Sequence, residues 1–221
     1  MIVWLASYPR SGNSLTRMLC RTLYGVQCHS VYREKLAYAS EADLRDMQNS
    51  DERFLVKTHE LPSDDNPAIY VLRDGRDALV SYAWFTISSG ADSSDAGSQR
   101  KFNAALKRLI DGKSRAKYGD WGRHVTEWTT RVPPVAVLKF EDLMGSDRAD
   151  LVRTALESVG FACSPQESAA VPSFERQHAR NPRLFRRGQV GAWKDEMPPA
   201  LVARFAKRYG DVMTQVGYEL S

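Results

Sequence analysis

The sequence has little of several features that would assign it to a specialised class. Its three cysteines, Cys20, Cys28 and Cys163, are an odd number and lack the spacing of metal ligands. No apolar run approaches the ~20 residues that span a bilayer, and the apolar stretch at residues 1–6 is too short for a secretory signal. We therefore expect a soluble cytoplasmic protein with reduced thiols, no resident metal and no membrane partner.

A large charge of one sign is also missing. The chain has 31 Lys and Arg residues against 27 Asp and Glu residues, so its formal net charge is +4. This balance suits an anionic ligand, but it falls short of the polybasic surface that nucleic-acid binding needs. We expect small-molecule ligands and no nucleic acid, and the sequence gives no oligomeric state.

What the chain does have is an alternation of short apolar runs with longer amphipathic segments. The short runs are β-branched or aromatic and predict buried strands at Ile2–Ala6, Phe54–Lys57, Ala68–Leu72 and Val135–Phe140. The amphipathic segments predict helices at Ser14–Tyr24, Ala78–Phe85, Trp121–Thr129, Leu151–Val159 and Ala200–Val216. Strands that alternate with helices indicate an α/β fold with a central parallel sheet flanked by helices.

The length of the chain and one long polar segment bear on its domain organisation. With 221 residues, of which 43% are hydrophobic, the chain can form one sizeable core, so we expect a single domain over residues 1–221. Residues 88–119 begin rich in Ser, Gly and Asp and then become basic, which predicts a long mobile loop leading into a helix.

The stretch "SYPRSGNS", residues 7–14, joins the first predicted strand to the first predicted helix. The first N–H groups of a helix have no acceptor within the helix, and together with the helix dipole they favour an anion. Gly12 permits close backbone approach, Ser11 and Ser14 carry hydroxyl groups, and Arg10 supplies a cation. A polar turn that only caps the helix is the alternative interpretation.

A nucleoside-triphosphate loop is a rival interpretation of this stretch. Its pattern, G-x-x-x-x-G-K-[ST], meets Ser7 at the first glycine and Asn13 at the lysine. Two defining positions therefore differ, which argues against an ATP or GTP hydrolase.

Three stretches in chain order resemble motifs of the sulfotransferases that use 3′-phosphoadenosine 5′-phosphosulfate (PAPS). "YPRSGNS" resembles their 5′-phosphosulfate loop, "VLRDGRDALVSY" at 71–82 their 3′-phosphate motif, and "RRGQVGAWK" at 186–194 their C-terminal loop. Smaller matches are "VKTHELP", "WGRHVTEW" and "FEDL". The cytosolic branch is the most similar pattern, and the resemblance implies its fold, which is related to the P-loop nucleotide kinases.

The resemblance also implies a binding site for PAPS and its product 3′,5′-adenosine bisphosphate (PAP). It assigns the 5′-phosphosulfate to Arg10, Ser11, Gly12, Asn13 and Ser14. It assigns the 3′-phosphate to Arg73, Ser81, Arg186, Arg187 and Gly188, and the adenine to Phe174 and Leu15. Independently of the family, Arg10 and Arg73 follow two predicted strands of a parallel sheet, whose carboxyl ends are where ligands bind.

His59 is the candidate general base. It ends the predicted strand in "VKTHE", and an imidazole titrates near the pH at which an acceptor hydroxyl group must lose its proton. Lys57 lies two residues earlier, hence on the same strand face, and is a candidate to orient the sulfonate. Arg10, which stands where the cytosolic branch has lysine, would stabilise developing charge without releasing a proton.

We therefore predict a PAPS-dependent sulfotransferase that acts on a hydroxyl group, or an amine, of a small-molecule or carbohydrate acceptor. Two alternatives stay open at this point. One is a nucleotide kinase of the related P-loop architecture. The other is a non-catalytic module that binds adenosine bisphosphate.

Overall fold

The computed structural model of the protein describes residues 1–33, 37–87, 96–113, 116–133, 135–166, 171–173, 176, 178–179, 186 and 188–220. The chain divides into two compact units, the first made of 1–73 and 127–171, the second of 74–126 and 172–221. The single domain over 1–221 stays a prediction. None of the helices in the described ranges is long and apolar enough to span a membrane.

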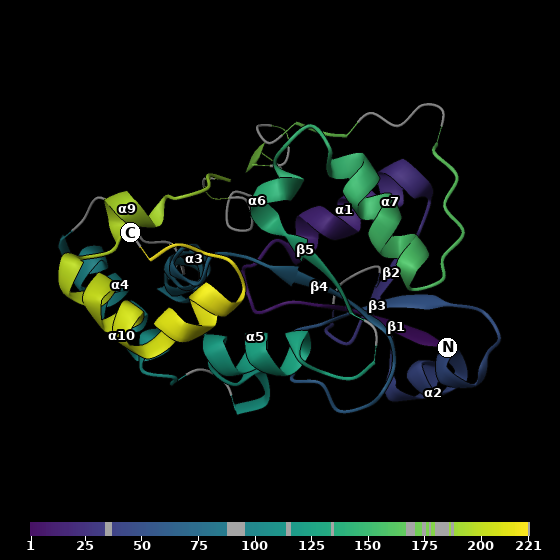
Figure 1. The fold of residues 1–221 in the computed structure, drawn as a ribbon, viewed down its shortest axis with the longest axis horizontal. Coiled ribbons are helices and arrows are strands. Elements are labelled where there is room, and N and C mark those ends of the chain that lie inside the picture. Colours follow the sequence, from purple (N-terminus) through teal and green to yellow (C-terminus); the bar gives the residue numbers. More distant parts are fainter. Residues whose placement is uncertain are drawn as a thin grey trace. The chain divides into compact units, whose positions relative to one another are not determined.

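The first unit is built on a five-stranded sheet, visible at the centre of Figure 1. Its strands are β1 (Ile2–Ala6), β2 (Cys28–Ser30), β3 (Phe54–Thr58), β4 (Ala68–Leu72) and β5 (Val135–Lys139). Their order is β2-β3-β1-β4-β5, and every neighbouring pair is parallel. The predicted α/β class with a central parallel sheet is therefore confirmed.

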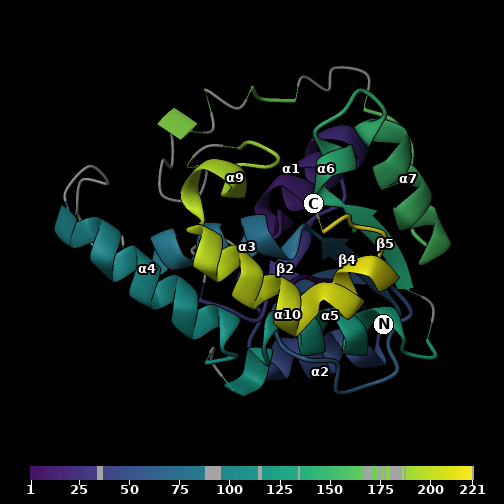
Figure 2. The ribbon, with the colours of Figure 1, turned by 60° about the vertical axis from the view of Figure 1, so that its left-hand side comes forward.

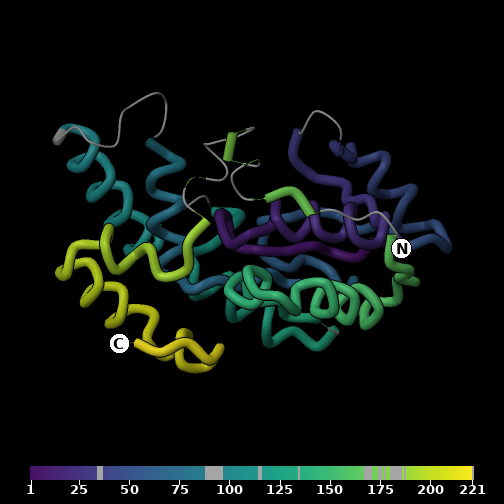
Figure 3. The backbone as a smooth tube through the Cα atoms, turned by 90° about the horizontal axis from the view of Figure 1, so that it is seen from above, coloured from purple at the N-terminus to yellow at the C-terminus, as the bar shows by residue number. Residues whose placement is uncertain are grey.

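One face of this sheet carries α1 (Asn13–Tyr24) and α7 (Arg148–Ser158), which pack against each other. Val3 and Leu5 of β1 point to this face and belong to a core that both helices share. Figure 3 follows β1 into α1, which runs back along the strand. Such a strand-turn-helix unit brings the start of α1 to the carboxyl end of β1.

The opposite face carries α2 (Glu41–Asn49), whose start is fixed by a capping box between Ser40 and Asp43. Ile2 and Trp4 alternate with Val3 and Leu5 and therefore point to this face, where they join a second apolar cluster.

The strand register gathers three strand ends at one edge of the sheet. Ala6, the last residue of β1, pairs with Thr58 at the end of β3 and with Tyr70 of β4. The residues that follow these strands, among them Ser7, His59 and Arg73, therefore emerge on the same edge. After β3 the chain crosses to the other side of β1, and such a reversal of strand order is where open α/β sheets bind ligands.

The second unit is helical in its described residues. Its helices are α3 (Gly75–Ile87), α4 (Ala96–Ile110), a 3-10 turn η1 (Ala116–Tyr118), the first residues of α5 (Trp121–Thr129), α9 (Trp193–Glu196) and α10 (Pro199–Gln215). The helix α4 packs against both α3 and α10, and Figure 2 shows α10 running alongside α4.

Several boundaries differ from the sequence prediction. Of residues 88–119, expected as a loop that leads into a helix, 96–110 are already the helix α4, while 88–95, 114 and 115 lie outside the described residues. Phe140 begins the short helix α6 (Phe140–Leu143) instead of ending β5. The sequence prediction also missed β2 and α2, because β2 has only three residues and α2 is mostly exposed, so neither gives a strong apolar pattern.

Candidate active site

The loop between β1 and α1 has a fixed and unusual backbone. Ser7 donates its N–H to the carbonyl of Thr58 at 3.3 Å, and Ser11 donates to the carbonyl of Tyr8 at 3.2 Å. Arg10 has φ 73°, a left-handed conformation that non-glycine residues seldom adopt. Strained backbone of this kind is concentrated at ligand-binding sites.

Gly12 is required by this geometry. Its φ is 105°, and a Cβ placed on it would lie 2.6 Å from Cδ2 of Phe140. Within the described residues no side chain caps α1 at Gly12, and no acidic residue stands in the first turn. The first N–H groups of α1 are therefore not used by a cap, as an anion-binding helix start requires.

The residues that open α1 have different surroundings. Asn13 is buried, and its side-chain nitrogen donates to the carbonyl of Leu5 at 3.0 Å and to Oγ of Ser7 at 3.2 Å. Its side chain is therefore directed at β1, so we now expect only its backbone N–H to serve a ligand. Ser14 is half-buried, and Leu15 packs against the core beneath α1.

Arg73, directly after β4, links the motif at 71–82 to the motif at 7–14 through a hydrogen bond. Its Nη1 donates to the backbone carbonyl of Arg10 at 3.2 Å, and its guanidinium lies 4.2 Å from the ring centroid of Phe140. The residue is only 9% exposed. A cation of this kind, held by a ring and by the loop, is suited to pair with a phosphate group.

His59 is oriented by contacts on its Nδ1 side. Nδ1 lies 2.8 Å from the backbone carbonyl oxygen of Ser7 and 3.2 Å from its Oγ. Because a carbonyl only accepts hydrogen bonds, the neutral ring carries its proton on Nδ1 and its lone pair on Nε2. His59 also donates its backbone N–H to Oη of Tyr32 at 2.8 Å, and the two rings stack with centroids 5.4 Å apart.

Lys57 is half-buried and lies on the α1 face of the sheet, as its alternation with Thr58 predicts. Its Nζ is 5.4 Å from the ring centroid of Tyr32, the ring that also stacks on His59. Among the residues that the structure describes, no group of His, Cys, Asp and Glu side chains is arranged to hold a metal ion.

The remaining predicted site residues belong to the second unit. Ser81 is half-buried in α3, and Gly188 has a positive φ of 61°. Arg186 pairs with Oε1 of Glu196 at 2.8 Å, so a phosphate group would have to compete with this carboxylate for it. Phe174 and Arg187 lie outside the described residues.

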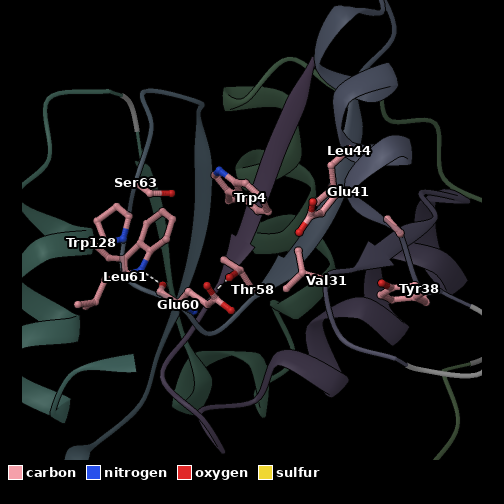
Figure 4. Close-up of a pocket in the computed structure, with 12 residues that line it drawn as sticks. Trp4, Val31, Tyr38, Glu41, Leu44, Thr58, Glu60, Leu61, Ser63 and Trp128 are labelled. Atoms are coloured by element: carbon pink, nitrogen blue, oxygen red, sulfur yellow. Dashed lines mark hydrogen bonds between the residues drawn. The ribbon is translucent and has the colours of Figure 1, made fainter. Parts of the chain in front are cut away.

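A pocket of about 320 Å³ opens on the α2 face of the first unit (Figure 4). Thr58 and Glu60, the chain neighbours of His59, are part of its wall, and Figure 4 shows the Glu60 carboxylate beside Thr58 with Glu41 on the α2 side. Trp128 donates its Nε1–H to the carbonyl of Glu60 at 2.9 Å, which fixes that wall. The lining thus combines two carboxylates with aromatic rings of Trp4, Tyr38 and Trp128.

Three residues of this site were missed from the sequence. Ser7 orients His59, Tyr32 contacts both His59 and Lys57, and Phe140 contacts Gly12 and Arg73. Ser7 had a signal, since it is the first polar residue after β1 and begins the stretch "SYPRSGNS". Tyr32 had none, because its contacts join segments far apart in the chain. Phe140 begins the "FEDL" match, but that match did not indicate its contacts with Gly12 and Arg73.

Comparison with known proteins gives a consistent family. The model of the Sulfotransferase domain family matches residues 2–217. Human Sulfotransferase 4A1 is 28% identical in a match that covers 96% of this chain and 80% of that protein. Mouse Sulfotransferase 1A1 is also 28% identical, in a match that covers 66% of this chain and 55% of that protein, so the chain spans about half the length of this relative.

A solved structure has the same fold. The crystal structure of mouse sulfotransferase SULT7A1 complexed with PAP superimposes with a TM-score of 0.71, covering 97% of this chain and 85% of that one. The sequence identity is 18%, so the likeness bears on the fold alone. It confirms the α/β sulfotransferase fold that the sequence motifs predict.

Proposed function

Because the chain belongs to the sulfotransferase family, we propose that the protein transfers the sulfuryl group of PAPS to a hydroxyl group, or an amine, of a small-molecule or carbohydrate acceptor. PAP is then the second product. The observation that carries this proposal is the gathering, at one sheet edge, of an uncapped helix start, two arginines and an oriented histidine.

The 5′-phosphosulfate is assigned to the loop 10–14. The backbone N–H groups at the start of α1, the hydroxyl groups of Ser11 and Ser14, and the Arg10 cation are donors of the type that an anion needs. The positive φ of Gly12 supports this assignment, since glycine adopts at little cost the left-handed backbone with which the loop enters α1.

The proton of the acceptor is assigned to Nε2 of His59. In the transfer, the bond between sulfur and the bridging phosphate oxygen breaks, a bond between sulfur and the acceptor oxygen forms, and His59 takes the acceptor proton. The hydrogen bond from Nδ1–H to Ser7 supports this role, because it leaves the basic lone pair on Nε2 and stabilises the charged ring that forms. Arg10 and Lys57 are assigned to the negative charge that develops on the oxygens.

The 3′-phosphate is assigned to Arg73, with Ser81, Arg186, Arg187 and Gly188 added on the family resemblance. Arg73 is supported by its own contacts, since the carbonyl of Arg10 and the ring of Phe140 hold its guanidinium at the sheet edge. The adenine is assigned to Phe174 and Leu15. No resident metal is needed in this scheme, because cations of the chain itself neutralise the transferred group.

The acceptor is assigned to the pocket on the α2 face. Thr58 and Glu60, the residues on either side of His59, are part of its wall, so an acceptor seated there has to reach the His59 ring past the end of β3. A volume of about 320 Å³ suits a small ring-bearing molecule. The carboxylates of Glu41 and Glu60 favour neutral or cationic acceptors over anionic ones.

The proposal is tested by incubating the protein with PAPS labelled in the sulfonate and a panel of phenols, alcohols, amines and sugars. We expect a labelled product with at least one acceptor, formed without added metal, together with PAP. Tight PAP binding without transfer to any acceptor would instead indicate a non-catalytic module, and phosphoryl transfer from ATP with Mg²⁺ would indicate a kinase.

A further inference from the structure

Asp77, in the first turn of α3, accepts two backbone hydrogen bonds from the C-terminal segment. Its Oδ2 accepts the N–H of Gly191 at 2.8 Å, and its Oδ1 accepts the N–H of Trp193 at 2.9 Å. The residue is 2% exposed. Both oxygens of one buried carboxylate are thus directed at a segment more than a hundred residues further along the chain.

A second contact holds the same segment from the neighbouring residue. The guanidinium of Arg76 lies 4.0 Å from the ring centroid of Trp193. Arg76 is itself paired with Asp74 at 2.7 Å and donates to the carbonyl of Glu219 at 2.8 Å. The side chains at the start of α3 therefore form a rigid support beneath residues 191–193.

The segment that precedes this support lies largely at the surface. Gly188 and Gly191 have φ values of 61° and 78°, and a Cβ on Gly191 would meet nothing within 4 Å. Gln189 and Val190 are exposed. Because an exposed turn opens easily, hydrogen bonds at its end help to fix it, and Asp77 accepts two of them.

We propose that Asp77 is a positioning residue for the turn 188–191, and that it acts through this turn to give the protein its preference for a 3′-phosphorylated nucleotide. The inference rests on the proposed function, in which the Gly188 N–H serves the 3′-phosphate. A carboxylate in direct contact with a phosphate group would repel it, but both Asp77 oxygens are already used by N–H groups of the turn. Its effect on the nucleotide is therefore exerted by fixing donors.

The test compares the Kd of PAP with the Kd of AMP, which lacks the 3′-phosphate, by calorimetry on the full chain. Asp77→Ala and Asp77→Asn are compared with wild type and with Asp120→Asn. Asp120 is a matched control, because it also accepts a backbone N–H, from Arg123 at 2.9 Å, and a side-chain hydrogen bond from Arg208 at 3.1 Å, and both of these partners lie outside the turn.

We expect Asp77→Ala to weaken PAP about tenfold or more, the effect of losing charge-assisted hydrogen bonds that orient the donors, while AMP changes less than about twofold. Asp77→Asn keeps the shape and one acceptor oxygen, so its Kd for PAP should lie between those of the wild type and Asp77→Ala. Asp120→Asn should keep the wild-type ratio of the two Kd values even if it lowers Tm.

The outcomes separate the inference from the proposed function. A wild-type protein without preference for PAP over AMP would overturn the proposed function itself. A wild-type preference that both Asp77 variants keep would overturn the role of Asp77 alone. If Asp77→Ala does not fold, the test rests on Asp77→Asn and on hydrogen exchange in the wild-type protein. PAP should slow exchange at the amides of residues 188–191, and AMP should not. Equal slowing by both nucleotides would overturn the inference.

Discussion

Nδ1 of His59 lies 2.8 Å from the backbone carbonyl oxygen of Ser7, the first residue after β1. This contact joins the end of β3 to the beginning of the loop between β1 and α1, so one strand pairing positions both the proposed base and the proposed anion site. Since the carbonyl belongs to the backbone, the orientation of the ring survives replacement of the Ser7 side chain. The ring of the proposed base is therefore oriented by the backbone of the sheet edge.

His59→Ala should abolish turnover while PAP binding persists. A positioned general base contributes roughly 10²- to 10⁴-fold to the rate, and we expect a loss of that order in kcat with the Kd of PAP changed little. The measurement is transfer of labelled sulfonate together with calorimetry. His178→Ala, at an exposed histidine, is the control. Full activity of the His59 variant would remove this residue from the mechanism.

Arg73→Ala should discriminate between nucleotides. If Arg73 pairs with the 3′-phosphate, the variant loses an ionic contact worth roughly 1.5 to 3 kcal/mol, or about one to two powers of ten in Kd. The Kd of PAP should rise far more than the Kd of adenosine 5′-phosphosulfate, which lacks the 3′-phosphate. Equal weakening of both ligands, measured by calorimetry, would mean that Arg73 only supports the loop through Arg10.

Gly12→Ala should destabilise the fold and weaken nucleotide binding together. The left-handed backbone costs roughly 1 to 2 kcal/mol for a residue with a Cβ, and the contact with Phe140 adds a cost of about 1 to 3 kcal/mol for overpacking. Urea unfolding measures the change. Gly210→Ala is the control, because it lies within α10 and its new Cβ would meet only the end of the Leu220 side chain, at 3.3 Å. A stable Gly12 variant would show that Phe140 moves aside.

The charge of the pocket should decide between acceptors. Glu41→Gln and Glu60→Gln should raise KM for a phenol that carries an ammonium group and lower it for a phenol that carries a carboxylate. The change should be a few-fold, the size of a solvent-exposed ion pair. Glu157→Gln, on α7 at the opposite face of the sheet, is the control. Identical KM ratios in all three variants would separate the pocket from the acceptor site.

The cysteines should differ in reactivity. Cys20 is fully buried in the core of the first unit, and burial raises the pKa of its thiol far above the ordinary value. A raised pKa keeps the thiol protonated at pH 8, where only a thiolate is alkylated readily. Cys20 should therefore escape iodoacetamide in the native protein and react after denaturation, as read by peptide mass spectrometry. Early labelling of Cys20 would show that the core beneath α1 opens easily.

Much of the local structure could be predicted from the sequence. The strands at Ile2–Ala6 and Ala68–Leu72 and the helix at Trp121–Thr129 have the predicted bounds, because a buried strand and an amphipathic helix each leave a periodic apolar pattern. The short β2 was missed since three residues carry no period. The order of the phosphate-loop, 3′-phosphate and C-terminal motifs was also readable, because each is contiguous in the chain.

What the sequence determined by itself was the α/β class, the family and the chemical types at the strand ends. Only the tertiary structure decided that the Asn13 side chain turns toward β1, that Ser7 orients His59, and that Phe140 presses against Gly12. The physical reason is how far apart the contacting residues lie in the chain. Periodicity and motif spacing report contacts between near neighbours in the chain, whereas these three contacts depend on how strands pair and where the following residues emerge from the sheet.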